Sequence, residues 1–514
     1  MAAFTTRDLM ELDAAVQPPP GKTDFDSEVN RMPHLADGSA IQRNRYALSP
    51  VVVAGSARLI EFCLVTLCGF LIHRVYVRPP IGTESEYYIA IPLVSLATLM
   101  IFRALGLDQI AALREPLRHG LRLMGGWALV FLVTMALVFF LKIDAIFSRV
   151  WLLSWFGIGL VVLTVERAAM AFVVRYMTRL GRLERRAVIV GGGPAGEEVL
   201  RNLAEQHDSD LRIYGVFDDR TDMRSPDVVA GFPKLGTVDD LVEFARHTAV
   251  DLVIFTLPIS AEKRLLQMLR KLWVLPIDIR LAAHMNKLRF RPRSYSYIGN
   301  VPVLDVFDKP IADWDLVVKA AFDKIVGAIC LILLAPVMAC VALAVKLTSK
   351  GPILFKQKRY GFNNELIEIY KFRSMYVNQL DFTATKQVTR NDPRVTPVGR
   401  FIRKTSLDEL PQLFNVVFAG NLSLVGPRPH AVNASAENRL YDKVVDGYFA
   451  RHRVRPGITG WAQVNGWRGE TNTNEKIQGR VEHDLHYIEN WSIMFDAYIL
   501  LMTPISVLRG DNAY

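Results

Sequence analysis

Cysteine is scarce in this chain, and the few cysteines present have no functional spacing. Only four occur among 514 residues, all in apolar runs: Cys63, Cys68, Cys330 and Cys340. Their separations fit neither a disulfide framework nor a set of metal ligands. We therefore predict that they pack as small hydrophobic side chains in a reducing compartment.

Two further features are missing. The first 45 residues are polar and contain no apolar stretch of the kind that marks a secretory signal peptide. We interpret residues 1–45 as a disordered cytoplasmic tail. The chain also has no compact basic stripe with interleaved aromatic residues. Its net charge of +10 therefore favours anionic lipid head groups or phosphate-bearing substrates over nucleic acid.

Long apolar runs, in contrast, are abundant. Four successive runs each approach the ~20 residues that span a bilayer: Val51–Val77, Tyr87–Leu107, Leu123–Leu141 and Val150–Met177. They predict a four-helix transmembrane bundle over residues 46–180. Arginines concentrate before the first run, between the second and third, and after the fourth, which predicts that both ends of the bundle face the cytoplasm. Glu166 and Arg167, inside the fourth run, are either functional or part of an ion pair.

A soluble α/β composition follows the fourth run. After a short buried-strand pattern, Gly191, Gly193 and Gly196 have the G-x-G-x-x-G spacing of a dinucleotide-binding loop. Asp218 follows the next predicted strand, where a ribose-binding acid is expected. The pattern predicts a Rossmann-like domain over residues 185–305. Its ligand stays open, because glycine loops also serve tight turns and close packing of a helix on a strand.

A fifth apolar run, within residues 319–346, carries Pro336 at its centre. Proline inside a helix removes a backbone hydrogen bond and clashes with the preceding turn. Lysines flank the run on both sides: Lys319, Lys324, Lys346 and Lys350. A spanning helix would leave one cluster outside, whereas a helix broken at Pro336 that enters and leaves on one face keeps both inside. We therefore predict a re-entrant membrane helix, with a kinked fifth span as the alternative.

Two short segments after this run, Phe355–Gly361 and Leu366–Phe372, predict a β-hairpin with Asn363-Asn364 at its turn.

Two adjacent carboxylates, Asp408 and Glu409, stand in a basic part of the sequence. The cations nearby are Arg394, Arg400, Arg403, Lys404 and Arg428. Adjacent carboxylates repel, so one is pushed towards protonation unless cations or a metal compensate. Such a pair suits phosphoryl chemistry, because one carboxylate can attack or hold Mg2+ while arginines bind the phosphate. The alternative is a helix start, with Ser406 as N-cap and both acids near the positive end of the dipole.

Four motifs follow one another in the C-terminal part of the chain. They are Lys371–Met375, Ser406–Leu413, Val425–Pro429 and Arg455–Trp461. Together they resemble the bacterial polyprenyl-phosphate phosphoglycosyl transferases. The resemblance implies an α+β catalytic domain over residues 313–514 that the re-entrant helix anchors to the cytoplasmic face of the membrane. It also implies that the middle domain is the accessory domain of the larger family members.

The resemblance implies a reaction as well. Members of this family move a sugar-1-phosphate from a UDP-sugar to undecaprenyl phosphate in the bacterial inner membrane, with release of UMP, and so begin an exopolysaccharide or capsule repeat unit. Glucose is expected first and galactose second, because the whole chain, including its Asn512-Ala513-Tyr514 ending, resembles glucose-1-phosphate transferases. The expected partners are the UDP-sugar, undecaprenyl phosphate and the bilayer; a homo-oligomer is left open.

Residue roles follow from the same resemblance. Asp408 is expected to attack the β-phosphate, to form a covalent phosphosugar intermediate, and to bind Mg2+, for which Mn2+ can substitute. Glu409 is expected to support metal or proton handling. Negative charge on the transferring phosphate would be neutralised by Arg373, Arg403 and Arg428. Most of the catalysis of phosphoryl transfer comes from such charge stabilisation. A last expected substrate contact is Asp484, which matches an acid of the family.

Two other function classes remain. A membrane-anchored, NAD-dependent nucleotide-sugar dehydratase or epimerase would be built on the glycine loop, but it needs a Tyr-x-x-x-Lys pair, and Tyr295 is followed four positions later by Gly299. A non-catalytic scaffold for polysaccharide assembly would use the Rossmann-like domain as a nucleotide sensor. The intact Asp408-Glu409 pair among its arginines argues against the scaffold.

Overall fold

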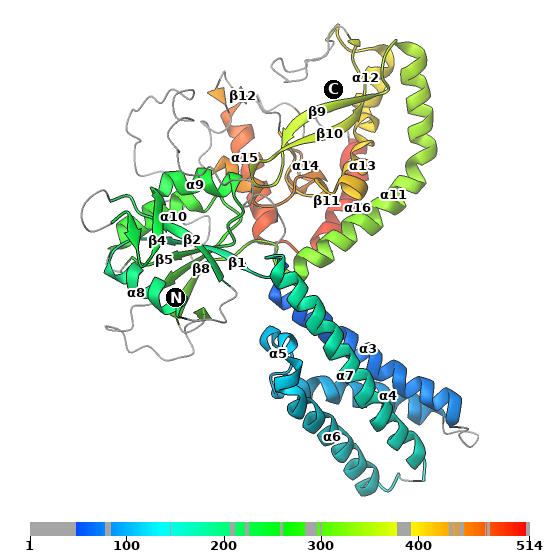
Figure 1. Cartoon of the computed structure of the whole chain (residues 1–514). Helices are drawn as coiled ribbons and strands as arrows, with labels where there is room; N and C mark the ends of the chain where they lie inside the picture. Colours follow the sequence, from blue (N-terminus) through cyan, green and yellow to red (C-terminus); the bar gives the residue numbers. More distant parts are fainter. Residues whose placement is uncertain are drawn as a thin grey trace. The chain divides into compact units, whose positions relative to one another are not determined.

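The structure is a computed structural model, and its chain divides into two compact units at Arg185 and Arg186 (Figure 1). It describes residues 48–77, 84–143, 145–205, 211–220, 226–257, 261–282, 296–298, 301–377, 392–430, 435–436, 439–440, 447–467, 469 and 473–509. The predicted tail over residues 1–45 and the Asn512-Ala513-Tyr514 ending lie outside these ranges. Each unit is described separately below.

The first unit is helical. Its helices are α3 (Pro50–Tyr76), α4 (Glu84–Ala104), α5 (Ile110–Arg114), α6 (Pro116–Phe140) and α7 (Arg149–Arg179). All except the short α5 are long and apolar enough to cross a membrane, and each of the four predicted apolar runs falls largely in one of them. A cluster of buried aromatic residues joins them, including Trp127, Trp151 and Trp155. Each indole N–H donates to a carbonyl of a neighbouring helix, so the aromatic core leaves none of these donors unpaired.

Of the two charged residues predicted inside the fourth run, Arg167 forms an ion pair between helices. Arg167 of α7 pairs with the buried Glu61 of α3, and its Nη1 donates to the Leu107 carbonyl at 2.8 Å. The guanidinium therefore links α7 to α3 and to the segment that follows α4. Charges inside a membrane bundle need such partners, because no water is present to solvate them.

The second unit begins with an eight-stranded mixed sheet. The strands are β1 (Arg185–Val190), β2 (Leu211–Phe217), β3 (Val228–Val229), β4 (Phe232–Gly236), β5 (Leu252–Phe255), β6 (Asp278–Ala282), β7 (Ser296–Ile298) and β8 (Val301–Phe307). Their order is β3-β4-β2-β1-β5-β6-β8-β7, and β5 pairs in parallel with both β1 and β6. The central strands are buried on both faces, as a parallel sheet between helices requires.

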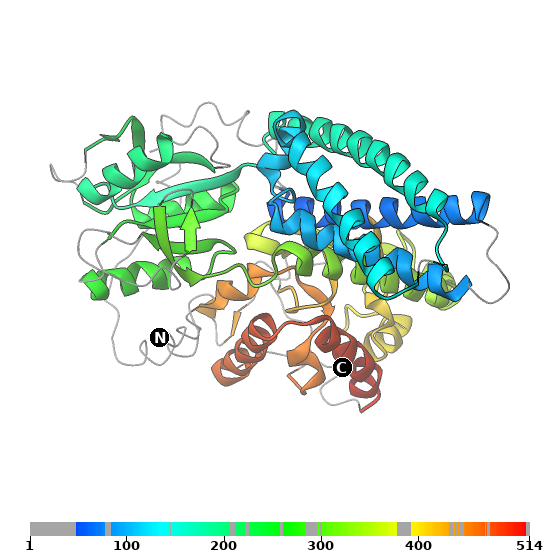
Figure 2. The ribbon, with the colours of Figure 1, turned by 90° about the horizontal axis from the view of Figure 1, so that it is seen from below.

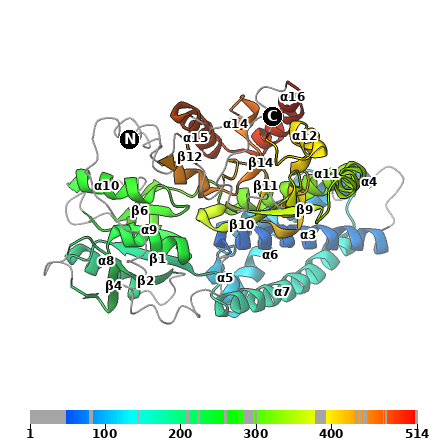
Figure 3. The ribbon, with the colours of Figure 1, turned by 90° about the horizontal axis from the view of Figure 1, so that it is seen from above.

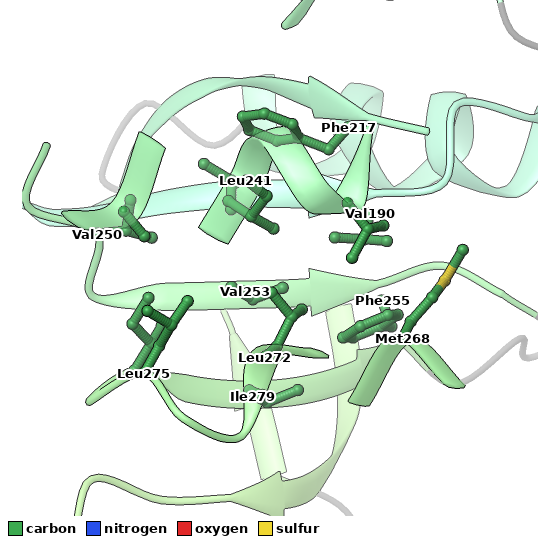
Figure 4. Packing of buried hydrophobic residues seen from close by; sticks show 14 of the residues in the cluster. Val190, Phe217, Leu241, Val250, Val253, Phe255, Met268, Leu272, Leu275 and Ile279 are labelled. Atoms are coloured by element: carbon green, nitrogen blue, oxygen red, sulfur yellow. The ribbon is translucent and has the colours of Figure 1, made fainter. Parts of the chain in front are cut away.

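Helices cover both faces of this sheet (Figure 2). Side chains of α8 (Pro194–Ala204) share one cluster with β1 and β5, while α9 (Val238–His247) and α10 (Glu262–Leu272) supply a second. Figure 4 shows the second cluster, in which Val253 and Phe255 lie among Leu241, Met268 and Leu272. The predicted combination of membrane helices with an α/β domain is therefore confirmed.

The C-terminal region, residues 313–509, combines helices with short strand pairs. Its elements are α11 (Asp313–Thr348), β9 (Leu354–Tyr360), η3 (Phe362–Asn364), β10 (Leu366–Phe372), α12 (Pro397–Lys404), η5 (Leu407–Glu409), α13 (Gln412–Phe414), η6 (Asn415–Ala419), β11 (Ser423–Val425), β12 (Ser435–Ala436), β13 (Arg439–Leu440), η8 (Tyr448–Arg453), β14 (Gly457–Thr459), α14 (Trp461–Val464), α15 (Asn474–Glu489) and α16 (Ile493–Arg509). The predicted hairpin with Asn363 and Asn364 at its turn is confirmed: β9 and β10 pair antiparallel, and both asparagines have positive φ.

The helix α11 contains Pro336 and bends partway along its length (Figure 1). Both of its halves pack on the C-terminal region. Lys319, near its start, donates to the Val425 carbonyl of β11 at 2.9 Å. Near its end, Val345 shares a cluster with Phe372 of β10 and residues of α12, and Figure 3 shows the hairpin beside this helix. Its other side exposes apolar residues, among them Ile332, Leu333 and Leu347.

Two glycine-bearing motifs meet along β11 and β14. The strands run parallel, with Ser423 opposite Gly457, and the Gly426 N–H donates to the Thr459 carbonyl at 2.9 Å. A Cβ on Gly457 would lie 2.1 Å from the Gly426 nitrogen, which no real side chain tolerates. Glycine is required here because two backbones touch, and this contact places the start of the Val425–Pro429 loop.

A matched pair of glycines in α7 tests the packing of the first unit. A Cβ on Gly159 would lie 2.5 Å from Cζ2 of the buried Trp127, whereas a Cβ on Gly157 would have no neighbour within 4 Å. We expect Gly159→Ala to destabilise the bundle by about 1–3 kcal/mol through overpacking. Gly157→Ala should be neutral or slightly stabilising, because alanine favours the helix. Thermal unfolding in detergent measures both; equal effects would contradict the close contact.

Candidate active site

The Asp408-Glu409 pair lies in η5, a single 3-10 turn fixed to β10 by a buried asparagine. Asn415 follows shortly after the turn and is fully buried. Its Oδ1 accepts from the Tyr370 N–H at 2.9 Å, and its Nδ2 donates to the Glu368 carbonyl at 2.7 Å. Because these bonds replace missing ladder partners of β10, they hold the turn beside Lys371.

Glu409 is held between two cations. Its Oε1 accepts from Lys371 Nζ at 2.9 Å and from Arg428 Nη2 at 2.5 Å. All three side chains are largely shielded from water, and charge-assisted bonds of this length are stronger than neutral ones. The structure thus brings together a predicted catalytic acid and a predicted substrate-binding arginine. Lys371 was expected only as part of a motif.

These side chains line an open cavity. Its wall consists of Arg359, Ile369, Lys371, Glu409, Gln412, Arg428, Pro429, Gly457 and Ile458. Its empty volume of about 240 Å³ includes the open space at its mouth. Its wall carries three cations to one acid, a charge balance that suits the phosphate portion of a substrate.

The pKa of Asp408 is raised to about 6, first by burial and then by the neighbouring charge of Glu409. Lys371, Arg403 and Arg428 oppose this rise. Burial also lowers the pKa of Lys371, against the attraction of the two carboxylates. Asp408 is therefore mostly ionised at neutral pH but close to its titration range. Among the described residues its carboxylate has no hydrogen-bond donor, which leaves it available to an electrophile or a cation.

Ser406 does not cap a helix in the way the alternative interpretation requires. It has a left-handed backbone, with φ of 58°, and its side chain makes no capping bond to the short turn that follows. A non-glycine residue in this region carries strain, and such strain is typical of functional sites. The strained residue stands two positions before Asp408.

The remaining predicted substrate-binding residues have different surroundings. Arg403 lies in α12, and its charge acts on Asp408. Arg373 is buried, and its Nη2 donates to the carbonyl and hydroxyl of Ser349, at the end of α11. Asp484 is buried in α15, where it accepts from Arg451 Nη2 at 2.6 Å. Neither Arg373 nor Asp484 is part of the cavity wall.

In the middle domain, the predicted cofactor residues contact one another. A Cβ on Gly196 would lie 2.1 Å from the Gly191 carbonyl oxygen, and Gly193 is the N-cap of α8. Asp218 is buried and accepts from the N–H of Gly192 at 2.8 Å and of Arg220 at 3.0 Å. The acid that would bind a ribose is thus engaged with the loop itself. These contacts are those of a tight strand–helix turn.

The sequence predicted the hairpin, but it did not predict that Arg359 and Lys371 of this hairpin line the cavity. Arg359 lies opposite Ile367, and residues two apart on one strand share a face, so Arg359, Ile369 and Lys371 point to the same side. Fixing the register from the Asn363-Asn364 turn would have revealed this shared face.

An apolar helix in the same region as a cationic cavity, with Glu409 in its wall and Asp408 next in sequence, is typical of a membrane-associated transferase of phosphoryl groups. Comparison with known proteins agrees with this class. Residues 314–510 match the family model of the bacterial sugar transferases, and residues 103–283 match a model described as a CoA-binding domain.

Full-length relatives are also similar. The chain is 36% identical over 427 residues (82% of this chain, 89% of the relative) to the UDP-glucose:undecaprenyl-phosphate glucose-1-phosphate transferase of Escherichia coli K12. It is 33% identical over 462 residues (89% and 94%) to the protein of the same name from Xanthomonas campestris pv. campestris. It is 29% identical over 427 residues (78% and 83%) to the undecaprenyl-phosphate galactose phosphotransferase of Salmonella typhimurium. The chain belongs to this family of undecaprenyl-phosphate sugar-phosphate transferases, as its motifs predicted.

The titration of Asp408 can be tested directly. A water-soluble carbodiimide reacts with protonated carboxyl groups, so labelling of Asp408 should rise as the pH falls through its pKa of about 6. Glu409→Gln removes the neighbouring negative charge and frees Lys371 and Arg428, so the midpoint should move to lower pH. Mass spectrometry of the labelled peptide measures the extent of labelling at each pH. Glu482→Gln, at an exposed position, serves as the control. An unchanged midpoint in Glu409→Gln would contradict the electrostatic coupling between Asp408 and Glu409.

Proposed function

We propose that this protein transfers a sugar-1-phosphate, glucose-1-phosphate first, from a UDP-sugar to undecaprenyl phosphate and releases UMP. The observation that carries the proposal is the Asp408-Glu409 turn at a cationic cavity, in a region that an apolar helix can anchor to a membrane. The names of the full-length relatives in Escherichia coli and Xanthomonas support glucose, since the galactose-specific relative is less similar. Such a step would begin a polysaccharide repeat unit at the bacterial inner membrane.

In the first step, an Asp408 oxygen attacks the β-phosphorus of the UDP-sugar. The bond from that phosphorus to the bridging oxygen breaks, and UMP leaves with the electron pair. In the second step, a phosphate oxygen of undecaprenyl phosphate attacks the same phosphorus, and the bond to Asp408 breaks to restore the carboxylate. A carboxylate suits this double displacement, because one site serves two acceptors in turn.

The cations supply the electrostatic part of the mechanism. Arg428 and Lys371 bind Glu409 and line the cavity, so their charge lies where the transferring phosphate gathers negative charge. Arg403 adds positive potential at Asp408 and favours its ionised, nucleophilic form. Arg373 bonds to Ser349 at the end of α11, so its proposed role is to support the site from there.

Mg2+ fits the donor chemistry of the site. The described residues contain no group of three metal-binding side chains, but Mg2+ is usually held by one or two carboxylates, with water and substrate phosphates completing its shell. The carboxylate of Asp408 would hold it, with Glu409 beside it, and Mn2+ would bind the same oxygens. The ion would supply charge neutralisation for the diphosphate.

We further propose that α11 enters and leaves the membrane on the cytoplasmic face. Lys319 at one end contacts β11, and Val345 at the other packs with β10, although both belong to one apolar helix. A straight helix of this length spans about 54 Å at 1.5 Å per residue, too far to return to one small domain across a bilayer. The bend of α11 in Figure 1, the presence of Pro336 within this helix and the flanking lysines support re-entry, which would hold Asp408 at the depth of the lipid phosphate.

The reaction is tested by UMP release from UDP-glucose and undecaprenyl phosphate with Mg2+, in nanodiscs. Wild type should release UMP, and Asp408→Asn should lose at least about 10³-fold in rate, since an amide is a poor nucleophile. Asn465→Ala removes an exposed side chain whose bond within the described residues stays in its own turn, and it should remain near wild type. Equal release by wild type and Asp408→Asn would overturn the mechanism. No release from any UDP-sugar would favour a scaffold.

The path of α11 is tested by cysteine labelling in a variant with the four native cysteines replaced by serine. Leu316→Cys and Lys350→Cys place thiols at exposed positions near the two ends of the helix. A membrane-impermeant maleimide should label both in inside-out vesicles and neither in intact spheroplasts. Labelling of the two ends from opposite sides would establish a spanning helix instead.

A further inference from the structure

A buried polar network lies directly behind the Val425–Pro429 loop and has no part in the mechanism described so far. Its members are Arg451 of η8, Asp484 of α15 and His430, which follows the loop. Arg451 is fully buried, and Asp484 is 2% exposed. Charges at such depth are costly unless they are paired and hydrogen-bonded, so their arrangement is specific.

Arg451 links this network to the loop. Its Nη2 donates to Asp484 Oδ2 at 2.6 Å and to the main-chain carbonyl of Arg428 at 2.8 Å. Its Nη1 lies 2.6 Å from Nδ1 of His430. Burial and the charges of Arg451 and Arg480 lower the pKa of His430 well below its ordinary value, so the ring is neutral and can accept this bond.

Three successive carbonyls of the loop are held by three different elements. The Gly457 N–H of β14 donates to the Pro427 carbonyl at 3.0 Å, and Arg359 of β9 lies 3.4 Å from that of Pro429. Arg451 holds the carbonyl between them. Two prolines already stiffen this backbone, so fixing the central carbonyl leaves the Arg428 backbone little freedom.

The direction of the Arg428 side chain matters because one terminal nitrogen of its guanidinium has a partner and the other has none among the described residues. Nη2 binds Glu409, whereas Nη1 is buried with no hydrogen-bond partner in the described part of the chain. Leaving a buried donor without a partner is unfavourable, and Arg428 lines the cavity, so this nitrogen is suited to a ligand oxygen there. A phosphate oxygen of the substrate would satisfy it with a charge-assisted hydrogen bond, while Nη2 stays on Glu409.

We propose that Arg451 and Asp484 are positioning residues: by clamping the Arg428 carbonyl they aim the Arg428 guanidinium at the transferring phosphate. Asp484 acts through Arg451, whose charge and orientation it fixes, and does not contact substrate. This inference rests on the proposed function, which makes Arg428 a phosphate-binding group. It assigns to the network an effect on turnover that is distinct from its effect on folding.

The test is a double-mutant cycle on UMP release, with kcat and KM for UDP-glucose measured separately in nanodiscs. Lysine cannot reproduce the planar fork that reaches a carboxylate, a carbonyl and an imidazole together. We expect Arg451→Lys to lower kcat about tenfold or more while KM changes less, because misplacing a group by 1 Å can cost up to about 10²-fold. In an Arg428→Ala background the same substitution should have little further effect.

Controls separate positioning from folding. Arg453→Lys changes another buried arginine of η8, whose described bond goes to the Asp308 carbonyl, and it should leave kcat unchanged. Asp484→Asn keeps an acceptor oxygen and should retain more activity than Asp484→Leu. If Arg451→Lys does not fold, Asp484→Asn takes its place in the cycle.

The outcomes are distinct. Independent, multiplicative losses from Arg451→Lys and Arg428→Ala would overturn the positioning role, as would a lowered melting temperature with normal kcat. A normal rate in Arg428→Ala would instead show that Arg428 does not bind the phosphate. Absence of UMP release by wild type would overturn the proposed function and this inference with it.

Discussion

The structure of the site depends on one oxygen of Glu409, which binds both Lys371 and Arg428. Two adjacent carboxylates in a shielded place repel each other, and a single nearby cation would not compensate for both. Glu409 takes most of this countercharge. Asp408 stays mostly ionised at neutral pH, and it has no hydrogen-bond donor among the described residues. The proposed mechanism needs this arrangement, because it requires one neutralised carboxylate beside one that is ionised and free to react.

Holding that contact requires three distant segments to meet at fixed positions, and backbone bonds do most of this work. Asn415 ties the turn that carries the acids to the strand that carries Lys371. The loop that carries Arg428 begins where Gly426 and Gly457 touch, a contact that only glycine permits. The motifs that look separate in the sequence therefore form a single packed unit. The close approach of their backbones explains their residue types as much as the chemistry does.

The sequence predicted the elements better than the directions of their side chains. Apolar length and the Asn363-Asn364 turn are local signals, and the membrane helices and the hairpin followed from them. The pairing of Asp408-Glu409 with a cationic setting was also visible, since adjacent acids need countercharge wherever they lie. Arg373 and Asp484 show the limit: both are charged residues in the expected region, yet Arg373 binds the end of α11 and Asp484 binds Arg451. Which way a charged side chain points depends on packing between segments far apart in sequence, and no local pattern records it.

The same distinction explains the glycine loop of the middle domain. Its spacing is that of a dinucleotide-binding turn, but the acid at the end of β2 bonds to the loop's own N–H group, and Gly196 packs on Gly191. The geometry that lets a pyrophosphate approach a backbone also lets a helix approach a strand, so one spacing serves either purpose. A ribose would have to compete with two backbone N–H groups for Asp218, whereas at the cavity the unpartnered nitrogen of Arg428 meets no such competitor in the described chain. The balance of satisfied and unsatisfied polar groups therefore favours the C-terminal region over the middle domain for the proposed chemistry.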